Sequence, residues 1–444
     1  MARRIHGGGL VAFYAVIVVL ALLAGCQRRP AEQPSAPPPV ASSTAEYAGG
    51  AACKECHEEI YNGWRATFHA YKFQPASPDF VVGDFSGSHP SQGKGNESVM
   101  RRADAGFSVT TIGPDGTSHE FPVRYAMGSV WKQRYITEFP NGGLYVLPTQ
   151  WNVKSQEWVD YFGPKGHKPG DGAFWSDSGR EFQYQCMGCH TTNSRVNFDA
   201  ATKKFNTQWT DLGVSCEACH GPGRRHIDAK IQDKSNTIIN PAKVADPQRA
   251  AMICAACHTR GASPDDRFAY PVAYRPGGQL NFEFDKKPAV YPDGSPKEHH
   301  QQFNDWEASG HAAAGVMCWD CHSPHARGKS NRFQLKLPGS MLCTTCHTVE
   351  ARNYHALHSV NNCIGCHMPS TVQSATPGDL RSHRMSVVRP ELTVEAGDVS
   401  KQPNSCNLCH YHREADPERL VHFLQAAQRP QSCKQCHDKE EPGD

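Results

Sequence analysis

The sequence predicts a mostly irregular fold with short α-helices and a small antiparallel β insertion. Only 38% of its 444 residues are hydrophobic, which is lean for this length, so something other than aliphatic side chains must fill the core. The chain also holds 19 Cys and 24 His, an excess that indicates metal, disulfide or covalent cofactor chemistry. Its formal net charge of +2 provides no basic field for nucleic acid, so we expect no nucleic-acid partner.

Cysteine spacing decides between these chemistries. Cysteines at i and i+3 of a helical turn share one face and can form thioethers to a porphyrin, while His at i+4 reaches the iron. Nine such C-x-x-C-H motifs occur, and each predicts one covalently attached haem c, which the short helices would surround in stacked groups. The motifs are Cys53/Cys56/His57, Cys186/Cys189/His190, Cys216/Cys219/His220, Cys254/Cys257/His258, Cys318/Cys321/His322, Cys343/Cys346/His347, Cys363/Cys366/His367, Cys406/Cys409/His410 and Cys433/Cys436/His437.

Zinc sites and disulfides explain this pattern less well. A zinc ribbon uses C-x-x-C pairs in twos and does not require His directly after each pair. A disulfide scaffold has no use for nine histidines in register, and a chain this long does not need disulfides to fold.

The N-terminus resembles that of an exported bacterial lipoprotein. Arg3 and Arg4 precede the apolar run Leu10–Leu23, which is too short to span a bilayer and indicates a signal peptide over residues 1–25. The run ends in a lipobox-like sequence at Cys26, the single cysteine outside the motifs, and a Pro/Ala/Ser-rich tether follows over residues 26–46. We expect a lipid on Cys26 and a location in the bacterial envelope, on the periplasmic side or at the outer membrane. Plain secretory cleavage or an uncleaved anchor are the alternatives.

The body divides unevenly. A first haem segment over residues 47–100 precedes a β-rich insertion over 101–165 and an eight-haem domain over 166–444. Alternating residues and intervening turns predict the strands Phe107–Ile112, His119–Arg124, Gln133–Phe139, Leu144–Pro148 and Trp158–Phe162.

Two helices are evident besides the motifs. One follows the first motif, where Ile60, Tyr61 and Trp64 recur at helical spacing. The other begins at Asp416 and Pro417 and runs to about Gln428. Between the last eight motifs too little chain remains for a conventional core, so stacked haems must supply most of the buried apolar surface and the apoprotein should not fold.

Fourteen histidines beyond the motifs and the signal peptide could supply second axial ligands. Seven lie close to a motif or a helix and are our candidates for iron ligation: His69, His226, His311, His325, His355, His358 and His383. His412 and His422 stay undecided. The remaining five lie in loops or the β insertion, where a surface role is as plausible as a functional one: His89, His119, His167, His299 and His300.

Several segments together resemble the bacterial multihaem c-type cytochromes of the cytochrome c-554-like and doubled-CxxCH type. They are Cys216–Gly223, Cys318–His325, Cys363–Pro369, Ser382–Arg384 and Arg389–Leu392. The resemblance implies mainly bis-His haems that pass electrons to and from redox partner proteins, which include other multihaem cytochromes.

The function that we expect is electron transfer through nine haems, with no catalytic residue assigned. The alternative is a multihaem oxidoreductase acting on a small nitrogen or sulfur compound, such as nitrite, hydroxylamine or tetrathionate, at a haem with an open distal site. Related enzymes often carry a modified motif ending in Lys, whereas all nine motifs here end in His. That difference favours the electron carrier.

Overall fold

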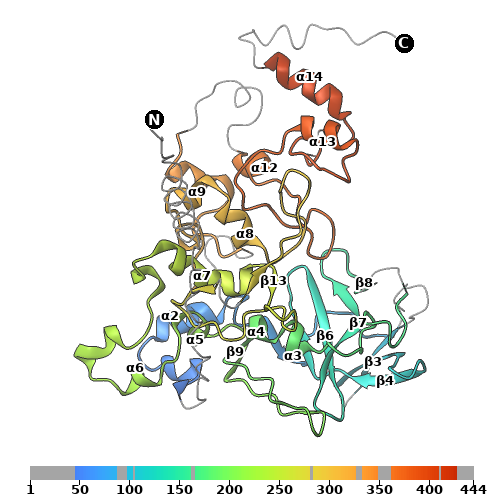
Figure 1. Cartoon of the computed structure of the whole chain (residues 1–444), viewed down its shortest axis with the longest axis vertical. Coiled ribbons are helices and arrows are strands. Elements are labelled where there is room, and N and C mark those ends of the chain that lie inside the picture. The colour runs from blue at the N-terminus through green and yellow to red at the C-terminus, as the bar shows by residue number, and fades with distance from the viewer. Residues whose placement is uncertain are drawn as a thin grey trace, which may run out of the picture. The chain divides into compact units, whose positions relative to one another are not determined.

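The computed structural model describes residues 46–87, 98–103, 106–161, 166–280, 284–326, 333–348, 362–409 and 412–427 (Figure 1). The signal peptide, Cys26 and nearly all of the predicted tether lie outside these ranges, as do His89, His355, His358 and His410. The ninth motif lies outside them too, with Cys433, Cys436 and His437. Among the described residues, no helix is both long and apolar enough to cross a membrane. Short helices and small antiparallel sheets make up the described chain, as the sequence predicts.

The larger sheet is five-stranded and antiparallel, in the order β1-β5-β6-β7-β8. Its strand β7 is buried along its whole length, and a bulge interrupts its pairing with β6 between Arg134 and Ile136. The strands are β1 (Phe73–Pro75), β5 (Tyr125–Met127), β6 (Lys132–Glu138), β7 (Leu144–Asn152) and β8 (Glu157–Asp160).

A second, three-stranded antiparallel sheet joins β2 (Val99–Ala103), β3 (Gly106–Ile112) and β4 (Ser118–Pro122). Side chains of β3 alternate between buried and half-buried, which is the pattern that predicted a strand here. Aromatic rings fill the core beside these strands, with Phe85 edge-on to Tyr135 and Trp158 at centroid distances of 4.9 and 5.2 Å.

Packing of this core crosses the predicted domain boundary at residue 165. Phe174 and Trp175 are both 1% exposed and belong to the same cluster as the strand residues. The indole of Trp175 also donates to the carbonyl of Ile112 in β3, at 2.8 Å. The chain leading into the second motif therefore packs against the sheets directly.

The rest of the described chain consists of short elements. Three two-stranded pairs join β9 (Thr191–Thr192) to β12 (Asp211–Leu212), β10 (Phe198–Asp199) to β11 (Lys204–Phe205) and β13 (Gly261–Ala262) to β14 (Asp285–Lys286). The helices are η2 (Gly50–Cys53), α2 (Glu58–Arg65), α3 (Phe182–Gln185), α4 (Met187–His190), α5 (Cys216–His220), α6 (Arg224–Asp228), η3 (Ile231–Asn236), η4 (Pro241–Lys243), α7 (Pro247–His258), α8 (Gln302–Glu307), α9 (Gly310–Ala313), α10 (Cys318–Cys321), η6 (Gly339–Thr345), α12 (Cys363–His367), α13 (Pro390–Ala396) and α14 (Pro417–Ala427).

Both helices expected outside the motifs are present as α2 and α14. The carboxylate of Asp416 accepts from the N–H of Glu418 at 2.9 Å, so it satisfies one of the unpaired donors at the start of α14.

Buried apolar side chains thin out toward the later motifs. Between Cys318 and Cys409, the buried hydrophobic residues of the described chain are Val372 and Val388, both 3% exposed. Such a stretch cannot build a core of its own, because a core residue normally contacts many apolar neighbours. A large apolar group held at the motifs would supply what is missing.

Candidate haem-binding sites

Seven of the eight described motifs contain a helical turn of the kind that thioether attachment requires. Helices α4, α5, α7, α10 and α12 each carry one motif, in α7 as its last turn. In the first and sixth motifs, the His N–H donates to the carbonyl of the first Cys, at 3.0 Å for His57 and Cys53 and 2.9 Å for His347 and Cys343. Bonds of this kind bring residues i, i+3 and i+4 onto one face of the turn.

Five motif histidines each face a second histidine from elsewhere in the chain. The pairs are His57 with His226 (6.3 Å between ring centroids), His220 with His325 (6.0 Å), His258 with His69 (6.3 Å), His322 with His383 (6.3 Å) and His347 with His311 (5.9 Å). Two imidazoles bound to one metal ion from opposite sides, with metal–nitrogen distances of about 2 Å, would have centroids about 6.3 Å apart. The pairs therefore have the spacing for one iron each.

These pairs join parts of the chain that lie far apart in the sequence. His226 follows the third motif closely but faces the first, and His325 follows the fifth motif but faces the third. All five facing histidines are among the seven that the sequence singled out, and the other two, His355 and His358, lie outside the described residues.

Hydrogen bonds at Nδ1 prepare several of these rings for a metal. The Nδ1 atom of His220 lies 2.7 Å from the carbonyl oxygen of Ile239, and that of His322 lies 2.9 Å from the carbonyl oxygen of Phe333. Because a carbonyl only accepts, Nδ1 carries the proton and Nε2 keeps a free lone pair. His226 is held in the same way by the carbonyl of Lys234, at 3.0 Å.

The protein also keeps several of these imidazoles neutral. Burial lowers the pKa of His69 to about 3, with Lys72 adding to the shift. Burial likewise lowers the pKa of His258 and of His383 to about 4. A neutral imidazole is the form that binds a metal ion, so these residues fit the iron that the motifs require.

Thiols of different motifs lie beside one another, although all sixteen cysteines in the described part of the chain are free of disulfides. Four pairs of thiols lie close enough to shift the pKa of one member: Cys53 with Cys216, Cys189 with Cys257, Cys254 with Cys318, and Cys343 with Cys363. Further thiols close to one another are Cys219 and Cys257, Cys321 and Cys343, and Cys366 and Cys409. The eight described motifs thus form one connected series, in which the fourth motif adjoins the second, third and fifth.

Three motifs are less enclosed by polypeptide than the other described motifs. Their second cysteines, Cys56, Cys346 and Cys366, are exposed, whereas the other described cysteines are half-buried. The sequence predicts attachment at all of them alike and does not distinguish these three, because exposure depends on which segments pack over a motif. A haem attached there would itself cover the sulfur, so the exposed side chains remain compatible with thioether attachment.

The ninth motif cannot be compared with the others in this way. Cys433, Cys436 and His437 lie outside the described residues, so the assignment of these three as haem attachment and ligand residues stays a prediction from the sequence.

The second motif differs from the five motifs with paired histidines. Among the described histidines, none faces His190 at the separation of the five pairs; its nearest ring neighbour is Phe182, 6.5 Å away. Its Nδ1 lies 3.3 Å from the carbonyl oxygen of Lys72. Burial lowers the pKa of His190 to about 3, and the positive charges of Lys72 and Arg134 contribute to that shift.

Cationic side chains gather near this motif, and we call Lys72, Lys132 and Arg134 the cationic cluster. His299 and His300 lie beside it, and burial lowers the pKa of both, so these two imidazoles are neutral. Arg134 lies 3.6 Å from the ring centroid of Tyr161, and its Nε donates to the side-chain oxygen of Gln150 at 3.0 Å. The Nδ1 atoms of His299 and His300 are 2.8 Å apart. Burial lowers the pKa of Lys132, a residue of β6, to about 6, and Arg134 adds to the shift.

Sequence reasoning missed most of this cluster. It left the neighbouring His299 and His300 undecided. It did not consider Lys132 and Arg134 of β6, because Lys and Arg on a strand ordinarily face water. The signal that could have found them is their position in β6, next to buried residues such as Gln133 and Tyr135.

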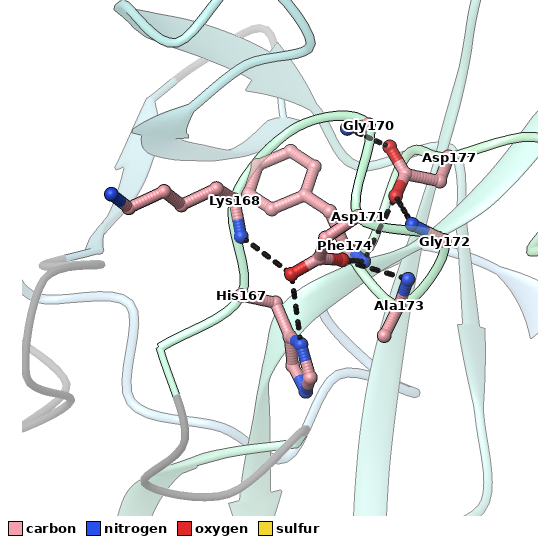
Figure 2. A network of polar contacts seen from close by, with 8 residues as sticks. All are labelled: His167, Lys168, Gly170, Asp171, Gly172, Ala173, Phe174 and Asp177. Atoms are coloured by element: carbon pink, nitrogen blue, oxygen red, sulfur yellow. Dashed lines mark hydrogen bonds and ion pairs between the residues drawn. The ribbon is translucent and has the colours of Figure 1, made fainter.

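Three other spare histidines lie away from the motifs. His119 contacts Asp115 at 2.8 Å on the exposed side of β4. His167 contacts Asp171 at 3.1 Å. The carboxylates of Asp171 and Asp177 accept hydrogen bonds from backbone N–H groups of the same loop (Figure 2). His422 is exposed on α14.

Comparison with known proteins supports the motif assignment. The family model described as doubled CXXCH motif matches residues 311–352, and the model described as cytochrome c554 and c-prime matches residues 52–82 and 173–221. The fold is similar to that of the outer cell wall cytochrome OcwA, with a TM-score of 0.64, 22% identity and 86% of each chain covered.

Two curated relatives are similar over parts of their length. The dissimilatory sulfite reductase MccA of Wolinella succinogenes is 23% identical over 461 residues, which cover 86% of this chain and 61% of the relative. The cytochrome c nitrite reductase subunit NrfA of Nitratidesulfovibrio vulgaris is 23% identical over 252 residues, which cover 48% of this chain and 42% of the relative. The chain thus spans less than two thirds of the length of either relative.

Proposed function

Since its motifs and family matches identify the chain as a multihaem c-type cytochrome, we propose that it carries electrons through nine haem c groups in the bacterial envelope. The five histidine pairs carry this proposal. A haem supplies a one-electron couple, and two histidine ligands leave its iron no position for a substrate. Sites built in this way exchange electrons and nothing else.

The chain's own residues set the paths between sites. The motif cysteines anchor each group, and adjacent thiols such as Cys254 and Cys318 require the attached groups to be neighbours. Nδ1 bonds to backbone carbonyls fix the ring orientation of His220, His226 and His322, so each ligand needs little reorganisation when the charge on iron changes.

The number of haems is tested by intact-mass analysis of the mature protein after expression with a full maturation system. We expect the mass of the chain plus nine haems. Fewer would show that some motifs carry none.

We further propose that a lipid on Cys26 holds the protein at the membrane and that the residues after it act as a tether. One similar structure is described as an outer cell wall cytochrome, which agrees with an exported location. Cys26→Ser should move the cytochrome from the membrane fraction to the soluble fraction. An unchanged distribution would contradict the lipid anchor.

A second function is favoured by the site at His190: reduction of a small oxyanion of nitrogen or sulfur. This motif lacks a facing histidine among the described residues, and the cationic cluster lies beside it. Arg134 and Lys132 would bind and orient the anion, and the electrons would come from the neighbouring fourth motif. Two relatives are described as sulfite and nitrite reductases.

Turnover with reduced methyl viologen tests this second function on nitrite and on sulfite in turn. Arg134→Leu should lower kcat/KM for the preferred anion by about 100-fold, which is the usual effect of removing a charge-stabilising donor. Arg102→Leu, on the exposed part of β2, is the matched control and should leave the rate unchanged. Absence of turnover with every anion would leave electron transfer as the sole function.

A further inference from the structure

An exposed segment of the chain follows the third motif. We call residues 224–243 the basic lobe; it contains α6, η3 and η4. Its five Lys and Arg outnumber its two Asp by three, whereas Lys and Arg exceed Asp and Glu by only two over the whole chain. Arg224, Arg225 and Lys230 are all exposed. The lobe therefore carries a net positive charge of three, with three of its cations on the surface.

Apolar side chains are exposed among these cations. Ile231, the first residue of η3, is 82% exposed, and Ile227 in α6 is 37% exposed. A protein partner would bury these two side chains together with the charges around them, since protein interfaces combine apolar and charged groups. A small anion would gain nothing from the isoleucines, so the combination indicates a protein.

The lobe is built around a ligand candidate. His226 in α6 has its Nδ1 3.0 Å from the carbonyl oxygen of Lys234, and the ammonium of Lys234 donates back to the carbonyls of His226 and Ile227 at 2.6 and 2.8 Å. The same His226 faces His57 of the first motif across 6.3 Å. His226, which belongs to the lobe, therefore links the exposed lobe directly to the site of the first motif.

The first motif stands at one end of the connected series. Among the described cysteines, the thiol neighbour of Cys53 is Cys216 of the third motif, whereas the fourth motif adjoins three others. The third motif is tied to the lobe as well, because the carbonyl of Ile239 accepts from Nδ1 of His220. An electron delivered at the lobe would therefore enter the series at its end.

We propose that the basic lobe is the docking site of an acidic electron-transfer protein that exchanges electrons with the haem of the first motif. This proposal rests on the proposed electron-transfer function. One electron passes from the reduced partner to the ferric haem, and no bond forms or breaks. Opposite charges steer such encounters and raise association rates, an effect that salt screens.

Stopped-flow reduction by a [2Fe–2S] ferredoxin, an acidic one-electron donor, tests the lobe in the full-length holoprotein. The variant Arg224→Glu/Arg225→Glu should lower the second-order rate constant about tenfold at low ionic strength, and the difference should vanish at high salt. The matched control Lys203→Glu/Lys204→Glu reverses two exposed charges near β11 and should react like the wild type. Ile231→Ser should slow the reaction at every salt concentration.

The outcomes separate the two proposals. Equal rates for the lobe variant and the control would overturn the docking site. A lobe variant that no longer bound anionic lipid vesicles but kept the wild-type ferredoxin rate would overturn it too. Reduction by dithionite needs no docking and should be the same for all variants. Failure of dithionite to reduce the wild-type haems would instead contradict the electron-transfer function.

Discussion

At the residue scale, the surroundings of the motif histidine differ between the second motif and five others. Five of these rings face a second imidazole, whereas His190 lies beside cations. The difference between the two arrangements lies in what stands opposite the motif histidine. A ring opposite would close a bound iron to substrates, whereas a cationic side chain would attract an anion to it.

The anion site should depend on pH through Lys132. Its pKa is lowered to about 6 by burial, so the ammonium is charged below that pH and becomes neutral as the pH rises. Nitrite affinity, measured from the loss of a high-spin EPR signal, should therefore fall between about pH 5 and about pH 7. Lys132→Met should bind nitrite weakly and without this dependence, and Lys203→Met should behave like the wild type. A Lys132→Met variant that kept the full pH dependence would assign it to another group.

Residue types could be predicted from the sequence, but their partners could not. Motif spacing gives the cysteines and the first ligand because one helical turn contains them all. The partner of His57 is 169 residues away and next to another motif, so local spacing points to the wrong neighbour. Such pairs form only when several motifs pack together.

At the element scale, the start of the described chain is held to the third motif by one carboxylate. Glu217 in α5 is 1% exposed and accepts from the N–H groups of Ala48 and Gly49, both at 2.9 Å, and of Gly223 at 2.7 Å. Charge-assisted bonds of this kind are about twice as strong as neutral ones. The carboxylate thereby sets the position of the first motif relative to the third.

Removing this charge should loosen the start of the chain. In Glu217→Gln, one oxygen becomes an NH₂ group that opposes the backbone donors it faces. Hydrogen exchange at Ala48 and Gly49 should become at least tenfold faster, because each charged bond contributes about 1.5–3 kcal/mol. The exposed Glu55→Gln is the control and should not alter exchange there. Unchanged protection in Glu217→Gln would mean that other contacts hold the segment.

Strands were predictable where strand-forming residues run for several positions between turns. The patterns at 107–112, 133–139 and 144–148 correspond to β3, β6 and β7. Strands β1 and β5 have three residues each, too few to show a period, and they form only because β6 offers an edge on which β5 and then β1 pair. The division of the strands into two sheets depends on that long-range pairing.

At the scale of the whole molecule, buried apolar side chains are unequally distributed along the chain. Aromatic residues fill the space beside the sheets, while the later motifs have few buried apolar side chains of their own. The low hydrophobic content of the sequence predicted this shortage. It did not predict the location, because the contacts between motifs cannot be read from their spacing in the sequence. Stability there should depend on the haems.

Loss of one haem should spread to neighbouring sites. Cys318→Ala/Cys321→Ala removes both attachment points of the fifth motif, whose thiols adjoin those of the fourth and sixth. We expect a mass lower by at least one haem, and faster proteolysis between the fourth and sixth motifs. Trp175→Ala, in the sheet core, is a contrasting variant: it should cost about 3–5 kcal/mol of stability while the haem number is kept. Wild-type resistance to proteolysis in the double variant would show that the haems are not part of the core.

EPR spectroscopy of the fully oxidised holoprotein tests whether paired histidines hold most of the haem irons. We expect mainly low-spin signals of bis-His haems, with a minor high-spin signal from the second motif that changes when nitrite is added. His226→Ala should convert one further haem, that of the first motif, to high spin, while the exposed His119→Ala should convert none. A wild-type spectrum dominated by high-spin iron would rule out paired histidine ligands at most sites, and a His226→Ala spectrum identical to that of the wild type would rule them out at the first motif.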